Sequence, residues 1–206
     1  MRMNRFTAAV VVVIVVVMRS AVAAVPPPMI STLDTLNGTR APVQPATSLS
    51  LGSTNVAFET STFADISIIG SAPIGQHGDA AGFEMWVCYT LSNEKQRLWL
   101  TSGELGGHEY IDGAVAQLLP SGTPATTDCP ELPSRYRPVH LDFGVWIGTL
   151  IQELTRHFGQ PTQCRDGSLY FAYSGKDGEY DVTDTLIVRL VNNRVVALRA
   201  NHITTN

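Results

Sequence analysis

Residues 185–200, Thr-Leu-Ile-Val-Arg-Leu-Val-Asn-Asn-Arg-Val-Val-Ala-Leu-Arg-Ala, give the clearest indication of the fold in this chain of 206 residues. Apolar and β-branched residues, which favour strands, fill both flanks of Asn192-Asn193. Asparagine tolerates the positive φ angles of a two-residue hairpin turn, so we expect two antiparallel strands that meet there. The aromatic segment Ser168–Ser174 predicts a third strand, which a turn at Gly175–Gly178 connects to the pair.

The segment before these strands, residues 149–161, predicts a helix. Thr149 and Gln152 have the spacing of a capping box, in which two side chains satisfy backbone N–H groups of the first turn. Gly159 favours the left-handed conformation that ends a helix, and Pro161 prevents its continuation. Four apolar residues recur on one face at helical spacing: Leu150, Ile151, Leu154 and Phe158. We therefore expect an α+β fold, in which this helix packs on an antiparallel β-meander.

Residues 61–119 form a β-rich first half. Short strands are expected near residues 66–70, 83–91, 97–101 and 110–119. Residues 120–139 are rich in proline, which cannot continue a sheet interior, so they are expected to connect this half to a second one at residues 140–206. The two halves look alike in outline, with an aromatic strand before a turn in each, which suggests a duplicated unit.

Residues 144–200 resemble the SmpA/OmlA-like family. The shared elements are a glycine before the helix, the Gly159-Gln-Pro161 exit after it, an aromatic strand, and the Asn192-Asn193 turn in the last hairpin. This family includes the small lipoprotein of the outer-membrane barrel assembly machinery, and its fold is shared with β-lactamase inhibitory proteins. The resemblance implies an α+β fold with a role in the cell envelope or as a secreted enzyme inhibitor.

Residues 1–24 have the organisation of a secretory signal peptide. Arg2 and Arg5 precede an apolar run over residues 6–18, and small residues then lead to Ala24. The apolar run is shorter than the roughly 20 residues that a membrane span needs. We therefore expect cleavage after Ala24 and export to the periplasm or the extracellular space.

The composition of the chain after Ala24 indicates which kinds of binding partner to expect. Residues 25–60 are rich in Pro, Ser and Thr and are expected to form a flexible lead. The full sequence has a formal charge of −4, and removal of the three arginines in the signal makes the chain more acidic. An acidic chain without a basic run disfavours nucleic acid as a partner. We expect the partner to be a protein or a cell-envelope component, with no stable membrane insertion after cleavage.

The chain contains three cysteines, Cys88, Cys129 and Cys164. In an oxidising compartment, an odd count indicates one disulfide and one free thiol. Cys88–Cys129 and Cys129–Cys164 would close loops of similar length, so chain entropy does not separate the two pairings. We favour Cys88–Cys129, with Cys164 free, because contacts within one half are more local.

Residues 103–112 contain the densest group of candidate catalytic or metal-binding side chains. Carboxylates and histidine are the residue types that bind zinc or act as acid and base. Those present are Glu104, His108, Glu109 and Asp112. The Gly106-Gly107 pair between two expected strands instead favours a hairpin turn with solvated polar flanks, and we prefer that interpretation.

The remaining sequence offers few catalytic signals. His157 adjoins the end of the expected helix, and His140 and Asp142 alternate along a strand as a candidate dyad. The sequence has no nucleophile elbow, phosphate loop or dinucleotide fingerprint, and we expect no cofactor.

These observations favour an exported, non-enzymatic protein that binds a protein or an envelope component. The alternative is a small secreted hydrolase or metal-dependent enzyme that uses Glu104, His108 and Asp112. A secreted enzyme inhibitor, implied by the resemblance, is a second alternative.

Overall fold

A computed structural model of the chain describes residues 24–28, 30, 38–78, 82–104, 107 and 109–206. The predicted signal peptide, apart from Ala24, lies outside the described residues and stays a prediction.

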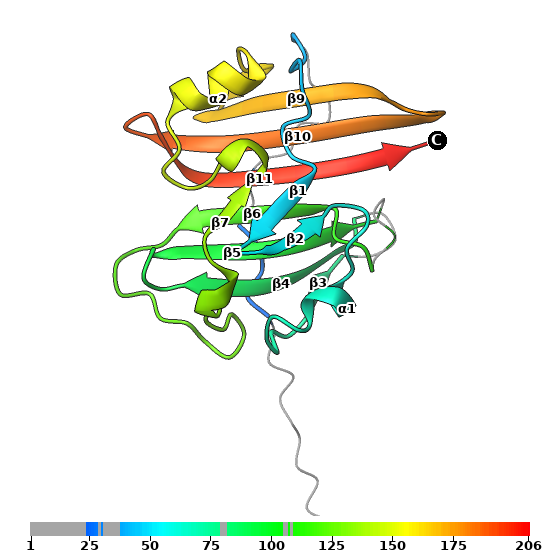
Figure 1. Cartoon of the computed structure of the whole chain (residues 1–206). Helices are drawn as coiled ribbons and strands as arrows, with labels where there is room; N and C mark the ends of the chain where they lie inside the picture. The colour runs from blue at the N-terminus through cyan, green and yellow to red at the C-terminus, as the bar shows by residue number, and fades with distance from the viewer. Residues whose placement is uncertain (1–23, 29, 31–37, 79–81, 105–106, 108) are drawn as a thin grey trace, which may run out of the picture.

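Eight antiparallel strands form the main sheet, in the order β3-β4-β5-β6-β11-β10-β9-β8 (Figure 1). Their bounds are β3 Gly75–His77, β4 Glu84–Leu91, β5 Gln96–Gly103, β6 Gly113–Leu118, β8 Gln163–Arg165, β9 Ser168–Asp177, β10 Tyr180–Val191 and β11 Arg194–Thr205. Strands β3 to β6 pair in sequence order on one side, and β8 to β11 do so on the other. Because β6 pairs with β11, the strands of both sequence halves belong to one continuous sheet.

A smaller antiparallel sheet, in the order β2-β1-β7, lies across the middle of one face of the main sheet (Figure 1). Its strands are β1 Ser48–Leu51, β2 Thr54–Ala57 and β7 Val139–Leu141. The helical elements are α1 Phe63–Ile66, the 3-10 turns η1 Ser134–Tyr136 and η2 Asp142–Gly144, and α2 Ile151–Phe158. Among the described residues, only α2 extends beyond a single turn.

The larger hydrophobic core lies between the two sheets. Leu98 of β5 and Leu198 of β11 are fully buried on this side of the main sheet. Leu49 and Leu51 of β1 are also fully buried in this core. They share one side of β1 because Ser-Leu-Ser-Leu alternates with the period of a strand. Most of the buried apolar side chains in the described structure belong to this core.

The α+β prediction is wrong, because the described chain is mostly β. The meander β9-β10-β11 forms as expected, but it is part of an eight-stranded sheet rather than a separate three-stranded unit. The second sheet covers much of the face on which the helix was expected to pack. Helix α2 contributes Leu154 and Phe158 to the core, but it is a minor element at one end.

Part of residues 25–60, which were expected to form a flexible lead, is folded instead. Its residues 48–57 form strands β1 and β2, whose inner side chains are buried. Closer to the N-terminus, Ile30 is buried on the opposite face of the main sheet, and Val25 packs against the same cluster. Both contacts fix parts of this segment to the folded protein.

The predicted Asn192-Asn193 turn is confirmed. Both residues have positive φ, at 51° and 60°, and Val191 pairs with Arg194 across the turn. The register then shifts between Arg189 and Leu190, where a bulge interrupts the β10–β11 ladder.

The helix begins later than predicted, at Ile151 after the N-cap Leu150. Thr149 does not cap it. The Thr149 hydroxyl instead accepts a hydrogen bond from the Trp146 N–H at 2.9 Å. The expected end is confirmed, since Gly159 has a φ of 76°.

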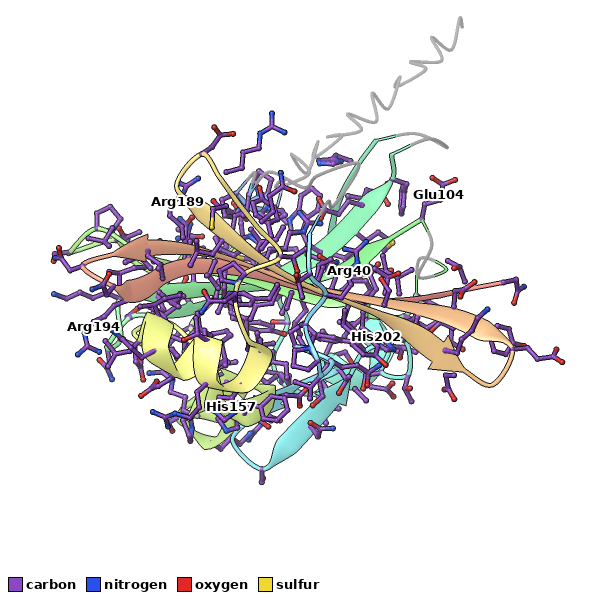
Figure 2. All side chains as sticks on the ribbon, turned by 90° about the horizontal axis from the view of Figure 1, so that it is seen from above. Arg40, Glu104, His157, Arg189, Arg194 and His202 are labelled. Carbon is purple, nitrogen blue, oxygen red and sulfur yellow. A yellow bond between two sulfur atoms is a disulfide. The ribbon has the colours of Figure 1, made fainter. Side chains whose placement is uncertain are left out.

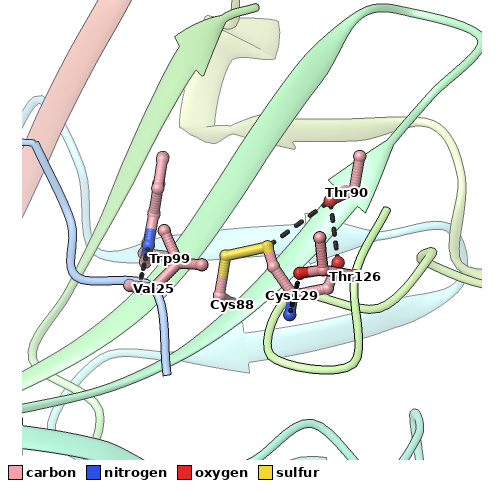
Figure 3. The surroundings of a disulfide bond; sticks show 6 residues. All are labelled: Val25, Cys88, Thr90, Trp99, Thr126 and Cys129. Carbon is pink, nitrogen blue, oxygen red and sulfur yellow. Dashed lines mark hydrogen bonds between the residues drawn. A yellow bond between two sulfur atoms is a disulfide. The ribbon is translucent and has the colours of Figure 1, made fainter. Parts of the chain in front are cut away.

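The predicted disulfide between Cys88 and Cys129 is confirmed (Figure 3). Both cysteines are fully buried, and their Cα atoms lie 4.7 Å apart. The Thr90 hydroxyl donates to the Cys129 carbonyl at 2.9 Å, which ties the connector to β4. Cys164, in β8, is exposed and forms no disulfide.

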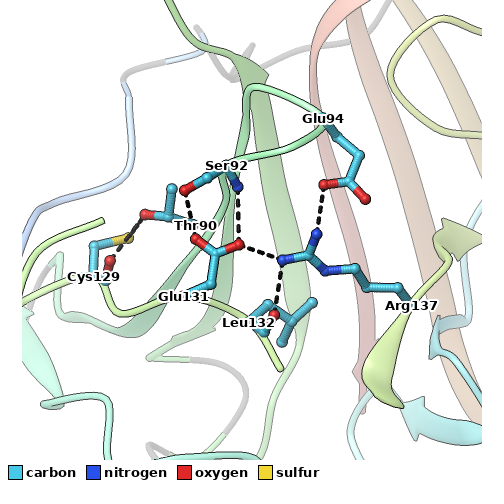
Figure 4. A network of polar contacts seen from close by, with 7 residues as sticks. All are labelled: Thr90, Ser92, Glu94, Cys129, Glu131, Leu132 and Arg137. Atoms are coloured by element: carbon cyan, nitrogen blue, oxygen red, sulfur yellow. Dashed lines mark hydrogen bonds and ion pairs between the residues drawn. The ribbon is translucent and has the colours of Figure 1, made fainter. Parts of the chain in front are cut away.

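Arg137 fixes the rest of the connector (Figure 4). Its guanidinium donates to Glu94 at 2.8 Å, to Glu131 and to the Leu132 carbonyl at 2.8 Å. Burial would raise the pKa of Glu131, but hydrogen bonds from Ser92 and Arg137 lower it overall. The proline-rich connector is therefore held against the β4–β5 turn.

No helix in the part of the chain that the structure describes is both long and apolar enough to cross a membrane.

Candidate functional site

A pocket lies beside the start of β4 and the end of β5, next to the interior of β10 and β11. Its volume is about 440 Å³. It is lined by His77, Gly82, Phe83, Glu84, Gly103, Glu104, Asp112, Thr185, Arg199, Asn201 and Ile203. Two of the predicted site residues, Glu104 and Asp112, therefore meet in one pocket.

The other predicted residues do not join this pocket. His108 lies outside the described residues. Glu109 is exposed and lines a different cavity beside α1, and its carbonyl accepts a hydrogen bond from the Phe63 N–H at 3.1 Å. Glu104 is exposed, and Figure 2 shows it on the other side of the sheet from α2 and His157.

No group of three His, Cys, Asp or Glu side chains among the described residues is placed to hold a metal ion. The metal site considered for Glu104, His108 and Asp112 gains no support from the residues that can be placed.

Asp112 has the most strongly shifted pKa of the groups that line the pocket. Its side chain is only 3% exposed. The Gly103 N–H donates to Oδ2 at 2.6 Å, but Oδ1 is buried without a hydrogen-bond partner in the described structure. Burial raises the pKa of Asp112 to about 6, although the Gly103 hydrogen bond and the charge of Arg199 oppose this rise. A buried acceptor without a donor is costly, so this oxygen is prepared to accept a bond from a ligand.

Arg199 and Glu84 form an ion pair across the pocket. The distance from Arg199 Nη2 to Glu84 Oε1 is 2.7 Å, and Arg199 Nε donates to Asn201 at 3.1 Å. Glu84 Oε2 also lies 3.6 Å from His77 Nε2. The charge of Arg199 is therefore shared mainly with Glu84, and Asp112 lacks a direct cationic partner.

Two glycines lie next to Asp112: Gly103, which lines the pocket, and Gly113, which follows Asp112 in the chain. A Cβ at Gly113 would come within 2.4 Å of the Ala200 carbonyl, and one at Gly103 would lie 3.1 Å from Asp112 Oδ2. The absence of a side chain at these positions leaves room for the Asp112 carboxylate beside Gly103 and for the close approach of β11 to Gly113.

A second polar cluster, which sequence reasoning missed, lies near this end of the sheet on the side of the larger core. His202 Nδ1 lies 2.5 Å from Asp184 Oδ1, and His202 Nε2 lies 3.7 Å from Glu59. Asp184 is fully buried. The hydrogen bond to Asp184 is the main cause that raises the pKa of His202.

The candidate dyad of His140 and Asp142 does not form. Asp142 accepts hydrogen bonds from Thr47 and Ser48, which fix the start of β1, while His140 Nδ1 contacts the Leu141 carbonyl. His157 stacks on Phe143 at 5.1 Å between ring centroids, beside the C-terminus of α2. Neither histidine lines the pocket around Asp112.

In comparisons with known proteins, no family model, no curated protein and no solved structure matches this chain.

Proposed function

We propose that this chain is an exported, non-enzymatic binding protein, and that the pocket around Asp112 receives a cationic group of its partner. Export to the periplasm or the extracellular space is supported by the signal-like N-terminus and by a buried disulfide, which forms in oxidising compartments.

The unpartnered Asp112 oxygen carries this proposal. Glu84, Glu104 and Asp112 bring three carboxyl groups to the pocket, whereas Arg199 is its one arginine. A lysine ammonium or an arginine guanidinium would supply the donor that Asp112 Oδ1 lacks and would offset the excess negative charge. The pocket volume lies in the usual range for small groups, about 300–1,000 Å³.

The partner is therefore a protein or envelope component that presents such a group. Inhibition of a secreted enzyme is one form that this binding would take, with the basic side chain supplied by the enzyme.

Binding of Nα-acetyl-arginine amide and Nα-acetyl-lysine amide, followed by NMR, tests the proposal. We expect saturable binding that weakens as the pH falls below 6, because Asp112 then becomes neutral. Asp112→Asn should weaken binding at least tenfold. Glu109→Gln, the same chemical change outside the pocket, should have little effect. Absence of saturable binding to both cations would overturn the proposal.

A hydrolase is the second candidate, and the raised pKa of Asp112 is the observation that favours it. A carboxyl group with a pKa near 6 can donate and accept a proton close to neutral pH. Turnover of an ester, peptide or glycoside that disappears in Asp112→Asn, but not in Glu109→Gln, would support this alternative.

A further inference from the structure

The face of the main sheet opposite the larger core carries a group of aromatic side chains. We call this group the aromatic face and define it as Trp86, Trp99 and Tyr170. Their exposed fractions are 3%, 1% and 2%. Side chains of Val115, Ile187 and Ala197 complete the same apolar cluster.

Residues 24–28 and Ile30, here called the arm, lie on the aromatic face. Ala24 and Ile30 are buried in its cluster, and Val25 packs against it. The Trp99 indole N–H donates to the Val25 carbonyl at 2.9 Å (Figure 3). These contacts join the arm to a strand far away in the sequence.

The sequence of the arm, Ala-Val-Pro-Pro-Pro, indicates what chemistry this face accepts. Successive prolines favour the polyproline II conformation, whose carbonyls make no internal hydrogen bonds. Aromatic grooves recognise such segments by packing rings against the prolines and donating hydrogen bonds to the exposed carbonyls. The Trp99–Val25 hydrogen bond supplies the donor part of this pattern at the carbonyl before Pro26, and Pro26 lines one cavity together with Trp86.

The arm leaves part of the face unused. A cavity of about 370 Å³ lies beside it, lined by Ala24, Pro26, Ile74, Gly75, Gln76, His77 and Trp86. The Trp86 indole N–H is buried and has no hydrogen-bond partner in the described part of the chain. Trp86 lies flat against Gly75, where a Cβ would approach its Nε1 within 2.4 Å. Trp86 therefore offers a second indole donor, which is covered while the arm is in place and lies in a side chain that lines this cavity.

We propose that the aromatic face is a docking surface for a proline-rich segment of a partner polypeptide, and that the arm is its intramolecular occupant. The partner segment gives one carbonyl to Trp99, in place of Val25, and another to Trp86, which the arm leaves without an acceptor. The arm therefore competes with the partner and lowers its apparent affinity.

The test uses purified chain that begins at Val25, the N-terminus expected after signal cleavage, with acetylated decaproline as the probe. The three indole N–H signals are followed by NMR. Trp86 and Trp99 lie on the proposed surface, whereas Trp146 donates to Gln96 elsewhere and serves as the internal reference. Ile30→Asp removes the apolar anchor of the arm. Ile68→Asp, at a side chain that is 68% exposed, is the matched control.

We expect Ile30→Asp to bind decaproline at least tenfold more tightly than the unmodified chain, with Trp86 and Trp99 shifting and Trp146 unchanged. Ile68→Asp should bind like the unmodified chain. Trp86→Phe in the Ile30→Asp background should lose at least tenfold in affinity. A ten-residue Gly-Ser peptide should cause no saturable shift in any variant.

The proposal is overturned if folded Ile30→Asp shows no saturable shift, or if Trp86→Phe leaves its affinity unchanged. Concentration-dependent dimers that exchange the arm between two copies would also overturn it, because a second copy would then be the occupant. If Ile30→Asp does not fold, a chain with Pro26, Pro27 and Pro28 all changed to Ser replaces it. Failure of both variants to fold would make the arm a permanent part of the core and would equally refute the proposal.

Discussion

Asp112 is buried with one carboxylate oxygen that no donor in the described structure satisfies, and this has opposite consequences for folding and for binding. The ionised carboxylate costs free energy in the folded state. A cationic ligand would recover that cost on binding. A residue that destabilises the free protein at neutral pH is therefore the one best prepared to hold a partner.

Asp112→Asn should accordingly stabilise the protein in a pH-dependent way. Asp112 has a pKa of about 6 when folded, against an ordinary value of 3.8 when unfolded, so the wild type loses stability as the pH rises through this interval. The variant should gain about 3 kcal/mol above pH 7 and little below pH 4. Urea unfolding at several pH values measures this. A gain of equal size at pH 4 and pH 8 would contradict it.

His202 should show its largest stabilising contribution at low pH. Its folded pKa is raised, chiefly by the hydrogen bond to Asp184, so the extra stability is present below the unfolded value of 6.5. It is lost as the pH rises through the folded pKa. His202→Gln should therefore cost about 2 kcal/mol at pH 5.5 and less at pH 9. Unfolding curves with a cost that grows with pH would refute this assignment.

The disulfide and the Asp184–His202 pair show what residue-level reasoning can and cannot predict. The disulfide was predicted correctly because contacts within one half of the chain are more local, which favours Cys88–Cys129. Counting back from the Asn192-Asn193 turn would pair Asp184 with Asn201. The bulge between Arg189 and Leu190 shifts the register by one residue and brings Asp184 opposite His202 instead.

At the scale of elements, tertiary pairing decides where α2 begins. Leu150 has extended backbone angles, with φ −77° and ψ 146°, and forms a bridge with Arg194. The Ile151 N–H donates to the Asn193 carbonyl at 3.0 Å. The hairpin thus holds Leu150 outside the helix, and the capping-box spacing of Thr149 and Gln152 could not reveal this.

Leu154→Ala tests how α2 packs in the core, and Thr149→Ala tests the hydrogen bond that Thr149 makes before the helix. Leu154 is fully buried in the core, and its truncation should cost roughly 2–5 kcal/mol. Thr149→Ala removes only the hydrogen bond from the Trp146 N–H and should cost about 1 kcal/mol. Urea denaturation measures both. Similar small losses in the two variants would show that α2 does not pack as described.

Strand β1 could have been found from its sequence. Ser48-Leu-Ser-Leu51 alternates polar and apolar residues, which is the signal of a half-buried strand. The prolines around it favoured an irregular segment instead. The two leucines are buried because the small sheet covers the main one, and composition does not reveal such a contact.

At the scale of the whole molecule, the Cys88–Cys129 bond joins β4 to the connector. The cysteines are 41 residues apart in sequence, so closing this loop in the unfolded chain should contribute about 4 kcal/mol. Replacing both cysteines with alanine should lower stability by about this amount in denaturant unfolding. Cys164→Ser is the control and should have little effect, because Cys164 is exposed. Equal stability of the double variant and the unmodified chain would contradict this prediction.

The α+β expectation was wrong because of strand pairing between distant parts of the molecule. Local patterns identified most strands of the main sheet, but pairing between β6 and β11 involves residues 113–118 and 194–205. No turn connects these strands, so no local signal reports that they meet. The sequence patterns therefore described two separate groups of strands where the structure has one sheet.

The position of β11 also sets an order of events during synthesis. Strand β6 is made long before β11, yet β11 is the strand that covers its free edge. Until β7 to β11 have followed, an incomplete chain carries an open edge that can pair with other chains. Such late, long-range closure delays folding, and an unfolded chain is the form that the export proposed above would require.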